Sequence, residues 1–569
     1  MTATTDASHG PRAGLLDPRD RSRSGRSLRR RLVPPAVGAV VLQGLVVAGD
    51  VIPAVDTLVY LESGRNLVAG DGFTRSGGPE LHFPPLVPAA LGVLTRVLGT
   101  EMGAVRVWEL ASGLALAAAV VALARRLWDD DDATVVAAWI GGTVAGLAPM
   151  LVRRGSGSEA ITAALLLAAL VVALGPRPSA GGGRPRLGAL AGAGALAGLA
   201  YLARPEALLP ALTIGAALVV DGLRRSRRGL DPSAAVVFGL GLALLVGPYL
   251  VYLHGHTGSW ALTAKSQDVS IEAWRAVAED DRAARDQILY AIDETGTGLA
   301  DDTRPLTALA REHPRAWAGI VGVNVRTIAR LYLVPASDER VALIPLPLLA
   351  AATWAAVRAR RRPAVVLAAA VGALPLVTCT VFFAQPRYLV LTTAVLAALA
   401  AGGIVSWWRR LPGRWPWALA AAVLLWSGAA TTAESWTHLP GTTRGETTTY
   451  ATVGEWFRTY TDPDARLMTR SFHLQHYSQR PVVALPAADL PAVIAFARAR
   501  SVRYLVADAR TIRARRAPLY DALILAADPP GLHEVAVFGT GRRTIRIFEL
   551  DPAPPPTGLP PLPLGFVGD

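Results

Sequence analysis

Two carboxylates stand at the ends of apolar segments, where their chemistry would meet both water and lipid. Asp56 follows the first apolar segment, and Tyr60 comes one helical turn later, so both would lie on one helix face. Glu159 opens a later apolar segment, in the run RRGSGSEAITAALLL. A carboxylate at this boundary could accept a proton from a hydroxyl group. We predict Asp56 and Glu159 as catalytic residues, with Glu159 facing Asp56 as its acid/base partner or as a metal ligand.

Structural explanations compete with this prediction. Asp56 could be a solvated loop acid or a helix cap, since perturbed functional acids are a minority of loop acids. An early glutamate suits the dipole of a helix that Ser156 or Ser158 would cap, which fully explains Glu159 in structural terms.

Cations at the segment ends are candidates for binding phosphate. Arg153 and Arg154 precede Glu159, while Arg204 and Arg387 lie beside prolines between apolar blocks. Guanidinium groups recognise phosphate, but they also anchor helix ends by reaching to lipid headgroups. Lys265 is the single lysine of the chain. It indicates either a site that needs a compact point charge or a chance exception to the arginine-rich composition, and the two explanations carry equal weight.

Tyr60, Tyr388 and His82 complete the predicted substrate-binding set. Tyr388 follows Arg387, and His82 lies in the run HFPPLVP, where a plain polar role is favoured because no spaced His/Cys set surrounds it. The chain contains no Walker loop, GxSxG, HExxH or CxxC pair. The predicted binding residues are Tyr60, His82, Arg153, Arg154, Arg204, Lys265, Arg387 and Tyr388, with a divalent metal possible and no other cofactor indicated.

Composition indicates a membrane protein with several spans. Of the 569 residues 52% are hydrophobic and 18% are charged, and mean hydropathy is +0.35. The apolar residues gather in blocks of roughly 17–25, the length that crosses a bilayer. We predict about eleven spans with a roughly 19-residue window. They lie near 33–49, 84–99 joined with 104–124, 133–150, 159–175, 187–203, 206–222, 233–253, 341–357, 364–383, 388–406 and 415–432.

The positions of the arginines predict how the chain is oriented. With a cytoplasmic N-terminus, each strong arginine cluster between spans falls inside, which the positive-inside rule requires. The net charge of +13 therefore reflects orientation in the plasma membrane, and nucleic-acid binding is not predicted. Residues 50–84, residues 254–340 and everything after about residue 432 would lie outside.

The chain divides into four predicted regions. Residues 1–32 form a disordered cytoplasmic tail, and residues 33–432 form the transmembrane domain. Residues 433–550 alternate short strands with helices, which predicts an extracytoplasmic α/β domain. Residues 551–569 are a Pro-rich tail. Within the 254–340 loop, 314–333 has helical periodicity and is predicted to lie along the membrane surface.

Several stretches in this order resemble GT-C glycosyltransferases, in the branch of the protein O-mannosyltransferases and the aminoarabinose transferases of lipid A (glycosyltransferase family 39-like). The matching runs are VDTLVYLESGRNLVAGDGF, HFPPLVPAAL, RRGSGSEAITAALL, YLARPEALLPAL, GSWALTAKS and QPRYLVLTTAVLAALAAGG. The resemblance covers most of the chain through short, loose motifs. Many relatives carry Asp-Glu in the first loop, whereas Thr57 follows Asp56 here, which puts a paired-acid or metal role at this position in doubt.

The resemblance implies a GT-C transmembrane fold and transfer of a sugar outside the membrane, with inversion. A polyprenyl-phosphate sugar would be the donor, and a hydroxyl on a protein, glycan or lipid the acceptor. Asp56 would be the base, Glu159 a second acid, and Lys265, Arg204 and Arg387 candidates for the lipid phosphate.

Two other classes of function remain open. A transporter or flippase of lipid-linked sugars would carry ionisable groups near mid-span and related halves, neither of which is evident. A structural envelope protein that binds a partner through its α/β domain would leave the grouping of Asp56, Glu159 and Lys265 unexplained.

Overall fold

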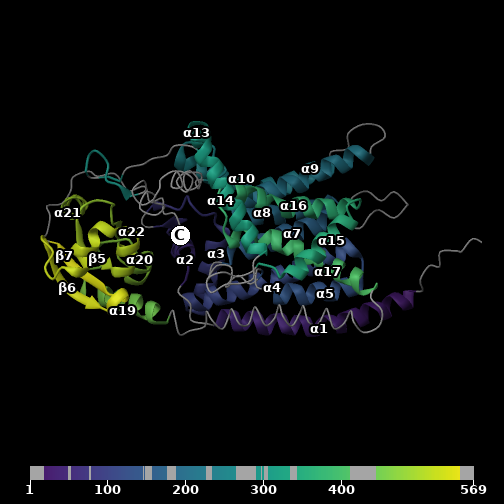
Figure 1. Cartoon of the computed structure of the whole chain (residues 1–569), viewed down its shortest axis with the longest axis horizontal. Helices are drawn as coiled ribbons and strands as arrows, with labels where there is room; N and C mark the ends of the chain where they lie inside the picture. The colour runs from purple at the N-terminus through teal and green to yellow at the C-terminus, as the bar shows by residue number, and fades with distance from the viewer. Residues whose placement is uncertain are drawn as a thin grey trace, which may run out of the picture.

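The computed structural model of the chain is dominated by helices (Figure 1). The structure describes residues 18–48, 53–75, 78–144, 147, 157–175, 187–225, 233–263, 290–296, 298–299, 306–333, 343–410 and 444–550. The helices of the first part of the chain are α1 (Pro18–Ala48), α2 (Val55–Ala69), α3 (Leu86–Leu98), α4 (Glu101–Trp128), α5 (Asp131–Thr143), α7 (Ser158–Ala173), α8 (Leu187–Ala203), α9 (Leu208–Arg225), α10 (Ser233–Thr257), α13 (Leu306–Glu312), α14 (Pro314–Leu333), α15 (Leu346–Arg358), α16 (Pro363–Val381) and α17 (Val390–Trp408).

Six of the described helical segments are long and apolar enough to cross a membrane. They are Ser27–Ala48, Glu101–Trp128, Pro205–Arg224, Ser233–Thr257, Pro363–Val381 and Pro386–Trp408. Shorter apolar helices, among them α7, α8 and α15, pack between them. The chain is therefore a multi-pass membrane protein. The predicted count of about eleven spans stays a prediction, because 415–432 and parts of other predicted spans lie outside the described residues.

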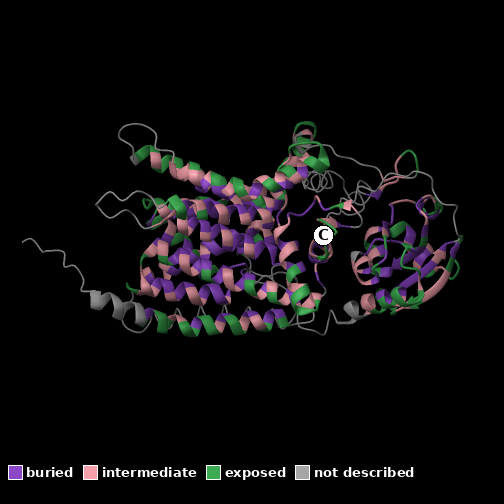
Figure 2. Cartoon of the chain, turned by 180° about the vertical axis from the view of Figure 1, so that it is seen from behind, coloured by how far each residue is buried: buried purple, intermediate pink, exposed green. Residues whose placement is uncertain are grey.

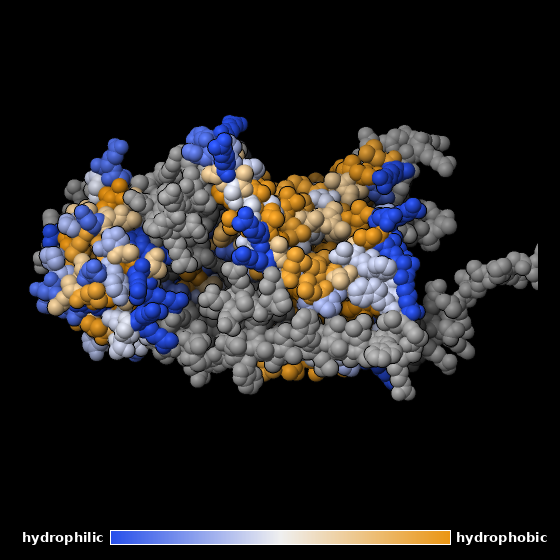
Figure 3. Space-filling view, in the orientation of Figure 1, coloured by the Kyte–Doolittle hydropathy of each residue, from blue (hydrophilic) through white to orange (hydrophobic). Residues whose placement is uncertain are grey.

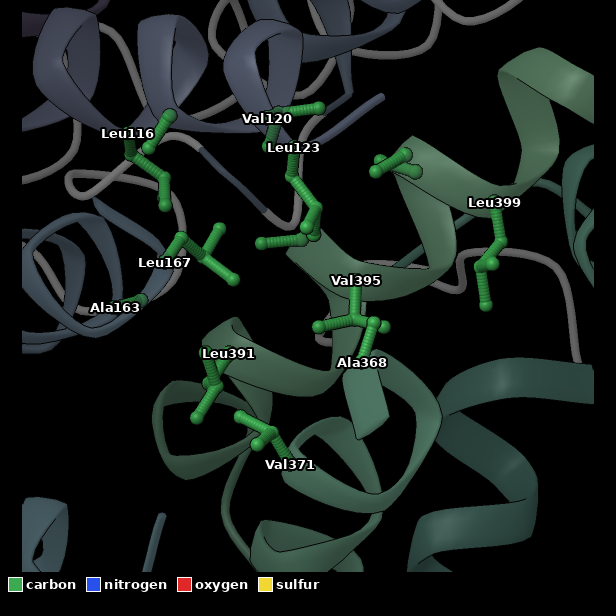
Figure 4. Packing of buried hydrophobic residues seen from close by; sticks show 14 of the residues in the cluster. Leu116, Val120, Leu123, Ala163, Leu167, Ala368, Val371, Leu391, Val395 and Leu399 are labelled. Carbon is green, nitrogen blue, oxygen red and sulfur yellow. The ribbon is translucent and has the colours of Figure 1, made fainter. Parts of the chain in front are cut away.

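Helices α4, α7, α16 and α17 meet in the largest apolar core of the bundle. Leu116, Leu167 and Leu399 are among its buried side chains, and Figure 4 shows buried side chains of this cluster on all four helices. Lipid offers no hydrophobic drive between helices, so close packing of such side chains must hold the bundle together. Figure 2 shows buried residues concentrated in the interior, with more exposed residues on the outlying α1 and α9.

The loop between α1 and α4 is a compact unit. A Cβ atom on Gly64 of α2 would lie 2.1 Å from the Pro88 carbonyl oxygen, and one on Gly92 of α3 would lie 2.2 Å from that of Gly64. Only glycine permits this approach of two helix backbones, so it fixes α2 against α3. Gly70 ends α2 with φ 93°, and its N–H donates to the Asn66 and Leu67 carbonyls.

A buried ion pair ties the rest of this loop together. Between α2 and α3, β1 (Thr74–Arg75) and β2 (Gly78–Pro79) form a short antiparallel hairpin. Arg75 Nε lies 3.1 Å from Glu80 Oε2, and Glu80 Oε1 accepts the backbone N–H groups of His82 and Phe83 at 2.7 and 3.0 Å. The Tyr252 hydroxyl on α10 donates to the Phe73 carbonyl at 2.9 Å. The loop is thus anchored to the bundle.

The opposite end of the bundle is rich in charge. Arg409, which follows α17, pairs with Asp130 at 2.7 Å and with Asp132 at 3.2 Å, and Asp132 also pairs with Arg31 of α1. The Arg362 guanidinium lies 5.9 Å from the centroid of the Trp128 ring. Figure 3 shows hydrophobic surface over the middle of the bundle and hydrophilic surface at its end away from the α/β domain.

Residues 444–550 contain a five-stranded sheet with helices, called here the α/β domain, at the other end of the bundle (Figure 1). The predicted domain bounds of 433–550 stay a prediction. Its strands lie in the order β4-β3-β5-β7-β6. Strand β3 pairs in parallel with β4 and β5, whereas β7 pairs antiparallel with both β5 and β6. The strands are β3 (Arg466–Thr469), β4 (Val482–Ala484), β5 (Val502–Asp508), β6 (Leu532–Phe538) and β7 (Ile545–Leu550). The helices are α19 (Arg444–Tyr460), α20 (Phe472–Ser478), α21 (Leu490–Ala499) and α22 (Ala509–Arg515), with short turns η4 (Ala517–Leu519), η5 (Asp521–Leu525) and η6 (Gly541–Arg543).

Two sequence predictions need correction. Helix α1 begins at Pro18, so residues 18–32 are helical, whereas they were predicted to belong to a disordered tail. Prolines at 34 and 35 lie inside this helix, and they did not end it. The α/β domain contains α20 and α22, which the sequence reasoning missed because seven residues are too few to show a helical period.

Helix α14 matches the predicted helix 314–333, and its Asn324 amide donates to the Thr380 and Phe382 carbonyls at 3.2 and 3.3 Å. Its predicted position along the membrane surface stays a prediction.

Candidate active site

Four chain segments bring polar residues together at the end of the bundle that faces the α/β domain. They are the first turn of α2, the first turn of α7, the break between α8 and α9, and η3 (Pro386–Leu389) before α17. Pro205 begins η2 (Pro205–Ala207) and Pro386 begins η3, and each arginine next to these prolines lies outside a regular α-helix. The prolines thus create the breaks that turn Arg204 and Arg387 into the site.

Asp56 and Arg387 form a buried ion pair. Arg387 Nη1 donates to Asp56 Oδ2 at 2.9 Å, and the side chains are 8% and 5% exposed. The same nitrogen lies 3.8 Å from Glu159 Oε1. Arg387 Nη2 donates to the Tyr388 hydroxyl at 2.7 Å. One guanidinium therefore links both predicted catalytic carboxylates, and a partner for its charge is essential because an unpaired charge at this depth is costly.

Glu159 and Arg204 form the second pair. Arg204 Nη1 donates to Glu159 Oε1 at 2.8 Å and to the Ser158 hydroxyl at 3.2 Å. Ser158 in turn donates to Glu159 Oε2 at 3.0 Å, and Glu206 accepts from Arg204 Nη2 at 3.1 Å. The cap of α7 is Gly157, with φ 60°, so Ser158 does not cap the helix, and Ser156 lies outside the described residues. Glu159 does more than suit the helix dipole, since it binds a buried cation.

The Tyr388 ring lies against both arginines. Its centroid is 4.6 Å from the guanidinium carbon of Arg387 and 5.3 Å from that of Arg204. An aromatic face attracts both cations and holds the planar groups in fixed orientations. Tyr388 thus contacts two other side chains predicted to bind substrate, and these arginines pair with both predicted catalytic acids.

Tyr60 lies beside this cluster, and His82 lies one ring further away. Tyr60 is 1% exposed, close to Ser158, and its ring packs edge-on against Phe83 at 4.7 Å between centroids. Burial, and then the negative charge of Asp56, raise the pKa of Tyr60 far above its ordinary value, so it stays a neutral phenol. The His82 ring packs edge-on against Phe83, with 4.5 Å between ring centroids.

Glu109 is a buried acid that the sequence reasoning missed. It is 1% exposed on α4, and a Cβ atom on Gly157 would lie 3.6 Å from its Cγ, so the start of α7 passes close above it. Its Oε1 atom and the hydroxyl of Ser112 have no hydrogen-bond partner in the described part of the chain. A glutamate inside an apolar segment was the available signal, since ionisable residues in such segments are rare and usually functional.

Three predicted binding residues lie outside the described residues. They are Arg153, Arg154 and Lys265. Their predicted part in phosphate binding therefore stays a prediction.

The described residues do not fit a metal site. No group of three or more His, Cys, Asp or Glu side chains among them could hold an ion. Arg387 occupies Asp56 Oδ2, while Arg204 and Ser158 occupy the two oxygens of Glu159. A cation would have to displace these donors.

This arrangement can combine proton transfer with anion binding. Asp56 and Glu159 are potential proton acceptors, while Arg204 and Arg387 present planar donors suited to phosphate or carboxylate oxygens. The two kinds of group neutralise one another in the structure, so an anion that binds an arginine would compete with a carboxylate for it.

Solved structures of similar fold include an archaeal oligosaccharyltransferase and a bacterial ArnT. The Archaeoglobus fulgidus oligosaccharyltransferase in complex with Zn and sulfate matches with a TM-score of 0.57 at 15% identity, over 87% of this chain and 71% of that chain. The archaeal oligosaccharyltransferase AglB of the same organism, in complex with an inhibitory peptide and a dolichol-phosphate, matches with 0.54 at 15% identity over 86% and 70%. ArnT from Cupriavidus metallidurans, bound to undecaprenyl phosphate, matches with 0.53 at 16% identity over 91% and 97%.

These likenesses confirm the GT-C fold that the sequence motifs predicted. No protein-family model matches the chain, and no curated protein matches it.

Proposed function

We propose that the protein is an inverting glycosyltransferase that moves a hexosyl or pentosyl group from a polyprenyl-phosphate donor to a hydroxyl acceptor. The observation that carries this proposal is the buried pair of Asp56 and Arg387, with Nη1 2.9 Å from Oδ2. It supports the proposal because a potential base and a potential phosphate-binding group lie side by side at the end of a membrane bundle. The solved structures of similar fold with dolichol-phosphate or undecaprenyl phosphate support the choice of donor.

In the proposed mechanism the donor phosphate competes with Asp56 for Arg387. Guanidinium groups form bidentate bonds with phosphate, so Arg387 and Arg204 would neutralise the charge that builds up on the leaving group. Asp56, released from its partner, would accept the proton of the acceptor hydroxyl. The acceptor oxygen then bonds to the anomeric carbon from the face opposite the phosphate. The bond from that carbon to the phosphate oxygen breaks, its electron pair leaves with the phosphate, and the configuration inverts.

Glu159 would hold Arg204 in place and share Arg387 with Asp56. Its two oxygens accept from Arg204 and Ser158, at 2.8 and 3.0 Å. Removal of its charge would loosen both guanidinium groups. Tyr388 would keep their planes aligned, and Arg153, Arg154 and Lys265 remain proposed additional contacts to the phosphate.

The proposed site faces outward from the plasma membrane. Helices α4 and α17 both run from the site end of the bundle to the end where Arg125, Arg126 and Arg409 lie. Arginine-rich ends mark the cytoplasmic side. The N-terminus would then be cytoplasmic and the α/β domain extracytoplasmic, and about eleven spans would satisfy this parity.

A reconstitution experiment separates this proposal from a transporter or flippase. The purified protein is placed in liposomes with polyprenyl phosphates that carry a labelled hexose or pentose, and cell-envelope extract is added outside as acceptor. A transferase is expected to yield labelled acceptor and free polyprenyl phosphate. Movement of intact donor between leaflets without cleavage would instead support the flippase and contradict the proposal.

A further inference from the structure

The α/β domain contacts the peptide that leads into α2. His473 Nε2 of α20 lies 3.1 Å from the Pro53 carbonyl oxygen. A carbonyl oxygen can only accept, so Nε2 must carry the hydrogen in this contact. Pro53 stands two positions before the start of α2 and three before Asp56. A residue of the soluble domain thus reaches the chain directly beside the proposed base.

His473 is itself fixed by the sheet of the α/β domain. Its ring stacks on Tyr450 with 5.1 Å between centroids and an interplanar angle of 15°. The Tyr450 hydroxyl donates to Asp508 Oδ2 at 2.6 Å, and Asp508 is the last residue of β5. Asp508 is 4% exposed and also caps α22. The orientation of the histidine ring is therefore set by a strand end, which is a rigid support.

The first turn of α2 depends on contacts from outside the helix. Its cap residue, Ala54, supplies no side-chain acceptor to the first backbone N–H groups. The Ala54 carbonyl accepts from Thr57 N at 2.9 Å and from Leu58 N at 3.2 Å. Asp56 lies within this turn. Any movement of residues 53–54 would therefore shift the carboxylate relative to Arg387.

A second histidine of α20 holds the neighbouring helices. His476 Nε2 lies 3.0 Å from Glu101 Oε2 at the start of α4, and Arg65 of α2 lies 3.3 Å from Glu101 Oε1. His473 and His476 are three residues apart, so they lie on one face of α20. That face thus meets the bundle at both α2 and α4.

We infer that His473 is a positioning residue, which acts through Pro53 to hold the first turn of α2 and keep Asp56 in register with Arg387. This inference rests on the proposed function for its catalytic consequence. It assigns the α/β domain a part in the active site, which neither the fold nor its resemblance to known enzymes supplies. A plain anchoring role for α20 would instead leave the order of the first turn of α2 unchanged.

Hydrogen exchange of the α2 amides tests the positioning role without any substrate. His473→Phe keeps an aromatic ring for Tyr450 but loses the donor, whereas His473→Gln retains an N–H near the position of Nε2. One hydrogen bond corresponds to about a 3- to 10-fold effect. Amides of residues 57 and 58 are expected to exchange about 3- to 10-fold faster in the Phe variant and at the wild-type rate in the Gln variant. Equal exchange in all three proteins would overturn the inference.

The matched control is His533→Phe, which changes an exposed histidine on β6 of the same domain. It is expected to leave exchange in α2 and sugar transfer at wild-type levels. An effect as large as that of His473→Phe would mean that the domain responds generally to loss of a histidine, and it would overturn the specific role of His473.

Transfer kinetics then test the link to Asp56. The Phe variant is expected to lower kcat about 3- to 10-fold, with the KM for donor changed by less than about twofold, and the Gln variant to recover most of the rate. In an Asp56→Asn background the same Phe change should have no further effect on the residual rate. Independent, multiplying losses would overturn the inference. If wild type transfers no sugar at all, the proposed function fails, while the exchange result still decides whether His473 positions α2.

Discussion

Arg387 Nη1 lies 2.9 Å from Asp56 Oδ2, although 331 positions of the chain separate the two residues. The pair joins the loop after the first apolar helix to the turn before α17. Both side chains are more than nine-tenths buried, where loss of one partner from an ion pair is strongly destabilising. The contact therefore fixes the first turn of α2 relative to the bundle.

Removal of the cation should be more damaging than its replacement. Arg387→Ala leaves Asp56 buried and without this partner, and we expect a loss of about 3–5 kcal/mol in the free energy of unfolding. Arg387→Lys retains a charge but loses the planar contact with Tyr388 and the second donor. We expect the lysine variant to fold with at least about a tenfold loss in transfer, measured by thermal unfolding in detergent and by donor turnover. Wild-type turnover in Arg387→Lys would show that planar recognition is unnecessary.

The two glutamates that bind Arg204 should contribute differently to the free energy of unfolding. Glu159 is 8% exposed and Glu206 is 53% exposed, and both accept from the same guanidinium. Glu159→Gln is expected to cost about 1.5–3 kcal/mol, the range for hydrogen bonds to charged groups. Glu206→Gln, as the matched control, should cost less than about 1 kcal/mol, because exposed ion pairs contribute little. Denaturation of both variants gives the comparison, and equal losses would contradict it.

The close approach of α2 and α3 should tolerate no side chain at Gly64. An added methyl group would clash with the Pro88 carbonyl at 2.1 Å, so Gly64→Ala should destabilise the protein by about 1–3 kcal/mol. Gly44→Ala on α1 is the control, since nothing lies within 4 Å of its Cβ position. There alanine should be neutral or stabilise by up to about 1 kcal/mol. Thermal unfolding measures both, and a neutral Gly64→Ala would mean that the two helices separate freely.

Tyr60 should make stability fall at alkaline pH. Burial and Asp56 raise its pKa in the folded state, so the folded protein retains a phenol proton that the unfolded chain loses above about pH 10. The unfolded state then binds fewer protons, and stability falls by up to about 1.4 kcal/mol per pH unit. Tyr60→Phe removes this contribution, so its stability should fall less steeply above pH 10 in otherwise identical denaturant titrations. Equal slopes of stability against pH in wild type and Tyr60→Phe would contradict the burial of the Tyr60 ring.

The linear order of charged residues and prolines was enough to predict much of the site. Prolines that interrupt apolar segments beside Arg204 and Arg387 predict both as site residues, and the structure pairs Arg204 with Glu159 and Arg387 with both acids. Which arginine pairs with which acid was not predictable, because it depends on how α2, α7 and η3 pack. His82 shows the converse, since its position in the loop gave no indication that Phe83 separates it from Tyr60.

The elements that the sequence reasoning missed are short or atypical. Helix α20 has seven residues, yet it carries both histidines that reach the bundle. Glu109 has no polar neighbour in sequence, so its approach to Gly157 follows only from the packing of α4 on α7. Long apolar helices can be predicted from the periodicity of the sequence, whereas a single contact between domains depends on how the whole chain folds.

Donor turnover by the Asp56→Asn variant tests most directly whether Asp56 is the base of the proposed reaction. Asparagine keeps the size of the side chain and a carbonyl oxygen for Arg387, but it cannot take up the acceptor proton. We expect at least about a hundredfold lower transfer of labelled sugar from polyprenyl phosphate, the lower end for loss of a general base. Folding and donor binding, followed by thermal unfolding and by equilibrium binding of polyprenyl phosphate, should be retained. Turnover equal to wild type, with donor binding unchanged, would remove Asp56 from the mechanism.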